Sequence, residues 1–160
     1  MSGEADHMAA KLSDLQGKRL SAFRKSYQRM AHVHFGQMSP RARVPDKAVY
    51  KDHGEFIVDM LDCDRAVEPS SGGSLTSLAD GDDHVFEAMA ALEGEVVSTV
   101  SLEAESLTLR IEFVSGGSLT LVGDAEVGPE NEQWAVTFPD RTVLMAVGRS
   151  ELRVEPAGSP

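Results

Sequence analysis

The sequence predicts an α+β fold built mainly on an antiparallel β-sheet of about seven to nine strands, curled or split into two layers. Three observations predict this class. Short runs of alternating apolar and polar residues fill most of the chain, turn-forming residues separate these runs, and one stretch has helical periodicity. With 160 residues, of which 41% are hydrophobic and 26% charged, the chain has the size and composition of one domain with a packed core.

The first residues of the chain are small and polar. We expect residues 1–16 to be a flexible N-terminal segment, because chain ends that bury little surface are poorly ordered. A short helix within it is the alternative, since Met8, Leu12 and Leu15 have helical spacing.

A β-hairpin is predicted from Gly17 onward. The runs RLSAFRK and RMAHVHFG alternate, which places His32 and His34 on the same face of the second strand. Residues 37–54 contain two prolines and many charges, so they predict a long exposed loop. GEFIVDMLDCDRAVE begins with a strongly apolar run and predicts one central strand.

The remainder predicts one principal helix and then a β-meander. HVFEAMAAL carries an apolar stripe at three- and four-residue spacing, formed by Val85, Phe86, Met89 and Leu92. Six short runs between residues 95 and 155 are separated by turn residues, as in consecutive antiparallel strands. Residues 17–156 are thus expected to form a single domain, and residues 157–160 a disordered tail.

Two stretches of the chain have similar patterns. Residues 17–35 can be laid over residues 94–113 with one extra residue in the second turn, which matches His32 to Arg110 and His34 to Glu112. The hexapeptide SGGSLT occurs at residues 71–76 and again at 115–120. The patterns favour an internal duplication, with chance similarity of two common hairpins as the alternative.

Charge is distributed unevenly along the chain. The net charge is −11, yet residues 11–51 hold ten Lys and Arg against two acids. We expect the basic strands to pair with acidic strands across the sheet, and an acidic or nucleic-acid partner for the basic segment is the alternative. Nucleic acid is an unexpected partner, because the rest of the chain is strongly acidic.

Several classes of protein have no support in the sequence. It has no run of about 20 apolar residues for a membrane span, and its start lacks the pattern of a signal peptide. The single cysteine, Cys63, cannot form an intramolecular disulfide, so a cytoplasmic location is expected. Motifs for a nucleophile, a nucleotide phosphate or a dinucleotide are missing, so we expect no cofactor.

His32 and His34 are the candidate metal ligands. Imidazoles at i and i+2 of a strand point the same way and can grip one ion. A third ligand would have to come from elsewhere in the chain, and the candidates are Asp59, Asp62, Asp64, His53 and His84. Two surface histidines without a metal are the alternative.

Four residues are candidate contacts for a partner protein. Arg41, Arg43 and Lys47 lie in the predicted exposed loop, where basic side chains are free to meet an acidic partner. Trp134 lies in the alternating run EQWAVTF, and it either packs in the core or anchors a partner.

Three segments together resemble small, uncharacterised β-rich bacterial proteins. They are the hairpin from Gly17 to Gly36, the strand with Asp64, Arg65, Ala66 and Val67, and the closing stretch from Leu109 to Trp134 with its G-G-x-L-x-L and E-x-W patterns. Some proteins of this kind are associated with toxin–immunity loci. The resemblance implies an immunity-like or accessory role and supplies no catalytic residues.

Two functions follow as expectations. The first is a non-enzymatic cytoplasmic domain that binds another protein, as an immunity-like or accessory factor whose acidic surface meets a basic partner. The second is a small metal-binding protein or metal-dependent enzyme that uses His32 and His34. Whether the protein is an enzyme is left open, with the non-enzymatic reading preferred because catalytic motifs are missing from the sequence.

Overall fold

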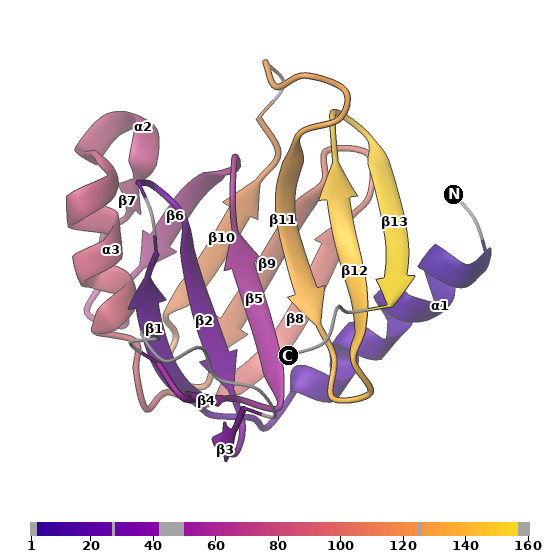
Figure 1. The fold of residues 1–160 in the computed structure, drawn as a ribbon. Coiled ribbons are helices and arrows are strands. Elements are labelled where there is room, and N and C mark those ends of the chain that lie inside the picture. Colours follow the sequence, from indigo (N-terminus) through magenta and orange to yellow (C-terminus); the bar gives the residue numbers. More distant parts are fainter. Residues whose placement is uncertain (1–2, 27, 42–49, 125, 157–160) are drawn as a thin grey trace.

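The computed structural model describes residues 3–26, 28–41, 50–124 and 126–156. Two antiparallel sheets lie one behind the other, with α2 and α3 at one side and α1 at the other (Figure 1). The six-stranded sheet has the order β1 (Leu20–Lys25), β2 (Ala31–Phe35), β5 (Phe56–Met60), β11 (Glu132–Thr137), β12 (Thr142–Val147), β13 (Glu151–Pro156). The five-stranded sheet has the order β7 (Leu75–Thr76), β6 (Asp64–Glu68), β10 (Ser118–Val122), β9 (Thr108–Phe113), β8 (Val97–Glu103).

The described part of the chain forms thirteen strands in three sheets, in place of the seven to nine that the sequence predicts. The run GEFIVDMLDCDRAVE is not one strand, because the chain turns at residues 61–63 and continues in the other sheet. The predicted loop also contains a small two-stranded sheet of β3 (Ser39–Pro40) and β4 (Asp52–His53). Two-residue strands such as these leave no periodic pattern, so the sequence could not predict them.

The prediction of one principal helix is wrong as well. Besides α3 (Asp82–Ala90), which includes most of the predicted stretch, the structure has α1 (Gly3–Ala10), the 3₁₀ helix η1 (Lys11–Leu15) and α2 (Ser77–Asp80). The segment expected to be flexible is therefore helical from its third residue. Its apolar stripe explains why, since Met8, Leu12 and Leu15 are buried in the core.

None of the helices in the described residues is long and apolar enough to cross a membrane. The inward side chains of both sheets form one hydrophobic cluster, and α1, η1 and α3 add residues to it. The alternation of apolar residues along the strands explains this cluster. Every second residue of β2 and β5 is buried: Ala31, Val33, Phe35, Phe56, Val58 and Met60.

Two halves of the chain have the same topology. The first half, β1, β2, β5 and β6, places three neighbouring strands in one sheet and sends its fourth to the other sheet, beside β10. The second half, β8, β9, β10 and β11, does the same and sends β11 beside β5. Each half thus completes the sheet of the other.

Hydrogen bonds at the junction follow an approximate two-fold relation. The Gly17 N–H donates to the Val97 carbonyl and the Gly94 N–H to the Leu20 carbonyl, both at 2.8 Å. Both glycines have positive φ, 83° and 93°, which side chains rarely tolerate. Two more bonds obey the relation: Leu20 N–H to the Glu95 carbonyl and Val97 N–H to the Lys18 carbonyl.

The two hairpins also share their register. In β1–β2, Ala22 lies opposite His34 after a bulge that follows Leu20. In β8–β9, Thr99 lies opposite Glu112 after a bulge that follows Val97. The two SGGSLT copies flank β6, so that Leu75 and Leu119 both lie opposite Val67.

Candidate functional site

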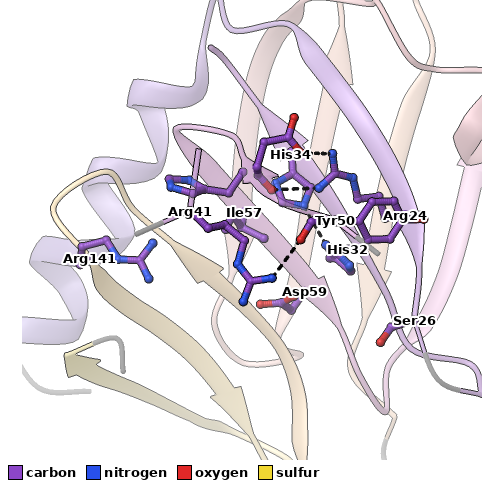
Figure 2. A pocket seen from close by; sticks show the side chains of 11 residues that line it. Arg24, Ser26, His32, His34, Arg41, Tyr50, Ile57, Asp59 and Arg141 are labelled. Atoms are coloured by element: carbon purple, nitrogen blue, oxygen red, sulfur yellow. Dashed lines mark hydrogen bonds and ion pairs between the residues drawn. The ribbon is translucent and has the colours of Figure 1, made fainter. Parts of the chain in front are cut away.

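A hollow of about 530 Å³ lies on the outward face of the six-stranded sheet, where Arg41, Tyr50 and Asp52 of the connection between β2 and β5 lie beside β1, β2 and β5. Figure 2 shows side chains from these strands, from that segment and from the β11–β12 turn around the hollow. The lining residues are Arg24, Ser26, His32, His34, Arg41, Tyr50, Asp52, His53, Ile57, Asp59 and Arg141.

Strand alternation and register place the central side chains. Because Val33 points into the core, its neighbours His32 and His34 point outward. His32 lies between Arg24 of β1 and Asp59 of β5 in the sheet register. Three ionisable side chains from three strands are therefore brought into one row.

The two histidines form a hydrogen-bonded relay. The backbone N–H of Gly54 donates to Nδ1 of His34 at 3.0 Å. Nε2 of His34 lies 2.8 Å from Nδ1 of His32. Gly54 fits closely here, because a Cβ at this position would lie 2.8 Å from the carbonyl oxygen of Phe35. The backbone thus passes near enough to His34 to fix one ring nitrogen.

Both histidines are held in the neutral form. Burial lowers the pKa of His34 to about 3, with added repulsion from His32 and Arg24. Burial and then the charge of Arg24 also lower the pKa of His32. The relay acts in the same direction, since a proton on Nδ1 of His34 would face the Gly54 N–H.

Arg24 is held in place by Asp52 and Tyr50. Its Nη2 lies 2.6 Å from Oδ1 of Asp52, and its Nη1 donates to the Asp52 carbonyl at 3.0 Å. The guanidinium also stacks 4.2 Å from the centre of the Tyr50 ring. The ion pair and hydrogen bond lower the pKa of Asp52, which keeps that carboxylate ionised.

Asp59 is the second carboxylate of the hollow. Burial raises the pKa of its carboxyl group to about 6, and the nearby charge of Glu132 acts in the same direction. Asp59 therefore carries a proton in mildly acidic solution, unlike Asp52.

Two further guanidinium groups reach the hollow. Arg41 donates from Nη1 to the Tyr50 carbonyl at 3.1 Å. Arg141 sits at the β11–β12 turn with φ at 70°, a left-handed conformation that is rare outside glycine. Among the described residues neither forms an ion pair, whereas Arg24 does. The hollow is therefore a basic site on an acidic protein.

The structure brings some of the predicted site residues together. His32, His34 and Arg41 all line the hollow, although they were candidates for two different functions. Arg43 and Lys47 lie outside the described residues.

Trp134 lies in the core and not at the surface. Its side chain is fully buried, and its Nε1–H donates to the Leu107 carbonyl at 2.8 Å. A partner that binds the folded surface cannot touch it, so the expectation of Trp134 as a contact does not fit its place in the core.

His32 and His34 are not arranged as the metal hypothesis expects. His32 and His34 do point the same way, but they bind each other, and His34 uses both ring nitrogens in hydrogen bonds. The described residues contain no group of three His, Cys, Asp or Glu side chains placed to hold a metal ion. The arrangement thus offers one open imidazole nitrogen, Nε2 of His32, in place of a two-histidine grip.

Sequence reasoning missed Arg24, Tyr50, Asp52 and Arg141 as site residues. Alternation does place Arg24 on the outward face of its strand, so part of the signal was present. Tyr50 and Asp52 come from a segment whose path over the sheet no local pattern reveals.

Comparisons of the chain with protein-family models, with curated proteins and with solved structures found no match. The function of the hollow is therefore inferred from its own residues.

Proposed function

We propose that the protein is a non-enzymatic binding protein that captures an acidic segment of a partner protein in this hollow. One observation carries the proposal. Three guanidinium groups, those of Arg24, Arg41 and Arg141, line one concavity of a chain whose net charge is −11. Arginine is the side chain best suited to carboxylate recognition, because its planar fork presents several donors at once.

The state of the histidines supports binding over metal chemistry. Neutral, hydrogen-bonded imidazoles act as donors and acceptors in a wall of the hollow, and His34 has no nitrogen left for an ion unless its bond to Gly54 breaks. The metal-binding alternative would need that rearrangement.

We propose an immunity-like or accessory role in a bacterial cytoplasm as the setting. Its support is the resemblance of three segments to proteins of toxin–immunity loci, together with a single buried cysteine. An acidic protein with one basic hollow is suited to a partner that presents a local acidic segment.

We also infer that the two halves descend from one β unit. The shared crossover, the shared bulge position and the reciprocal hydrogen bonds of Gly17 and Gly94 support this origin. Chance similarity of two hairpins does not account for matching contacts at the junction.

A peptide titration tests the proposed function. The probe is a fluorescein-labelled tetraglutamate peptide at low ionic strength, with a tetraglutamine peptide as the neutral reference, and binding is followed by fluorescence anisotropy. We expect the acidic peptide alone to bind, and Arg41→Gln to weaken it by about tenfold, because a charge-assisted hydrogen bond is lost.

The matched control is Arg149→Gln, an exposed arginine at the other end of β12 from Arg141. It should leave the affinity within about twofold, as expected for a charge outside the site. Equal losses in both variants would show a general charge effect, and no binding by the unaltered protein would contradict the proposal outright.

A further inference from the structure

The hydrogen bonds of the relay decide where its protons lie. The Gly54 backbone N–H can only donate, so Nδ1 of His34 must accept and carries no proton. A neutral His34 then carries its proton on Nε2, which faces Nδ1 of His32 at 2.8 Å. That second nitrogen must accept in turn, so the proton of His32 lies on Nε2.

The Gly54 N–H, which can only donate, therefore fixes the tautomer of His34, and His34 in turn fixes the tautomer of His32. Protonating either ring at its Nδ1 would set two N–H groups against each other, so the relay also excludes the imidazolium forms. The open end of the relay is the Nε2–H of His32, which has no hydrogen-bond partner among the described residues. The hollow thus presents a neutral N–H donor whose direction is set by the backbone.

The groups around this donor favour an anion with one charge. Arg41 supplies a guanidinium that is not ion-paired among the described residues, while the charge of Arg24 is largely committed to Asp52. Asp59 lies opposite His32 in the register and adds negative charge when it is ionised. A doubly charged phosphate would face that carboxylate, whereas a carboxylate ligand adds a single charge.

From the relay and its surroundings we infer that the hollow binds a carboxylate group through the Nε2–H of His32 together with the guanidinium of Arg41. His34 and Gly54 act as positioning residues, because they set the donor without touching the ligand. The inference rests on the proposed function, which it deepens by naming the group that is recognised and the residue that directs it.

Histidine tautomers can be measured without any ligand. Long-range proton–nitrogen correlation spectra of the full chain distinguish the protonated from the bare nitrogen of each ring. We expect Nε2–H for both His32 and His34 in neutral solution. A proton on Nδ1 of either ring, or an imidazolium form of either ring, would overturn the relay and with it this inference, while leaving the peptide titration of the proposed function unaffected.

Two variants of His32 then test the donor with the labelled tetraglutamate peptide. His32→Gln retains a neutral N–H donor and should stay within about threefold of the unaltered protein. His32→Leu removes the donor and should weaken binding roughly tenfold to a hundredfold, as for a lost hydrogen bond to a charged group. Equal affinities of the two variants would overturn the role of His32, and a melting curve of each shows that it is folded.

A phosphoserine tetrapeptide and zinc chloride serve as competing probes. We expect the phosphopeptide to bind more weakly than tetraglutamate, and zinc to leave the histidine resonances unchanged. Tighter binding of the phosphopeptide would contradict the carboxylate assignment, and stoichiometric zinc binding that is lost in His32→Gln would contradict both the relay and the binding function. A failure of tetraglutamate to bind while both rings carry Nε2–H would refute the proposed function and leave the tautomers as found.

Discussion

The outward faces of the two halves share one backbone pattern and differ in almost every side chain that they present. His32 of β2 corresponds to Arg110 of β9. In each strand the next outward side chain follows two residues later, His34 in β2 and Glu112 in β9. On the first half, two neutral histidines lie in a hollow, and His32 is flanked by Arg24 and Asp59 in the register. On the second half, Arg110 bonds to Glu112 at 2.8 Å and forms an ion pair with Glu68 at 3.6 Å.

The connections between strands explain the difference. The connection between β2 and β5 places Arg41, Tyr50 and Asp52 beside the first face, whereas residues 114–117 join β9 to β10 in a tight turn. Side chains on the first face are partly buried. Burial favours neutral imidazoles and raises the pKa of a carboxyl group such as that of Asp59. An open face favours exposed ion pairs, which are screened and contribute little. The same strand arrangement thus carries a hollow where side chains of a long connection lie beside it, and a solvated surface where the connection is a tight turn.

The largest effect is expected where the halves differ inside the core. Trp134 of β11 and Arg65 of β6 occupy corresponding places, opposite Met60 and Leu121 respectively. Trp134→Ala should lower the free energy of unfolding by about 3–5 kcal/mol, because it removes a fully buried ring.

Arg65→Met is the matched change in the other half. It should cost less than about 2 kcal/mol, since two guanidinium nitrogens of Arg65 have no hydrogen-bond partner among the described residues and Asp82, its ion-pair partner, keeps a second ion pair with Arg29. Urea unfolding of both variants compares their free energies of unfolding. A larger loss for Arg65→Met than for Trp134→Ala would show that the guanidinium of Arg65 stabilises the strands more than the ring of Trp134 does.

The second effect concerns the covered histidine. The pKa of His34 is about 3 in the folded protein and 6.5 in its ordinary state, so only the unfolded chain gains a proton between these values. The contribution of His34 to stability should therefore fall as pH is lowered from about 6.5 toward 3, by about 1.4 kcal/mol for each pH unit. His34→Asn keeps an acceptor for Gly54 and should flatten this slope. Parallel curves for the two proteins would contradict the neutral relay.

Asp59 should act in the opposite direction. Its pKa is raised from 3.8 to about 6, so the folded protein holds a proton that the unfolded chain has lost, and stability falls as pH rises between these values. Asp59→Asn removes this contribution, and the variant should gain stability relative to the unaltered protein as pH rises. The difference between the two unfolding curves isolates Asp59, because His34 contributes to both. A constant difference across this range would show that Asp59 is solvated.

Alternation in the sequence predicted the outward placement of His32 and His34 and the inward placement of their neighbours. It could not predict that residues 61–63 turn the chain into the other sheet, because no glycine or proline marks the break. Nor could it show that Asp59 lies beside His32, since register between strands distant in sequence is set by tertiary packing. The same limit hid Arg24 and Tyr50, whose contact depends on the path of the covering segment.

The smallest effect is expected on the open face. Arg110→Ala should change the free energy of unfolding by less than about 1 kcal/mol, because its ion pairs with Glu68 and Glu112 are solvent-exposed. It should also leave the affinity for the tetraglutamate peptide unchanged. Arg110→Ala therefore serves as a control for Arg41→Gln on the corresponding face of the second half. A loss of binding in Arg110→Ala would place the site on the wrong half.

Chemical-shift mapping tests most directly whether one face alone became the binding site. Backbone proton–nitrogen spectra are recorded while the tetraglutamate peptide is added to the unaltered protein. We predict that the largest shifts fall on Gly54, His32 and Arg41, and that Arg110 and Glu112 do not move. Shifts centred on Arg110 and Glu112, or spread equally over both faces, would contradict the account.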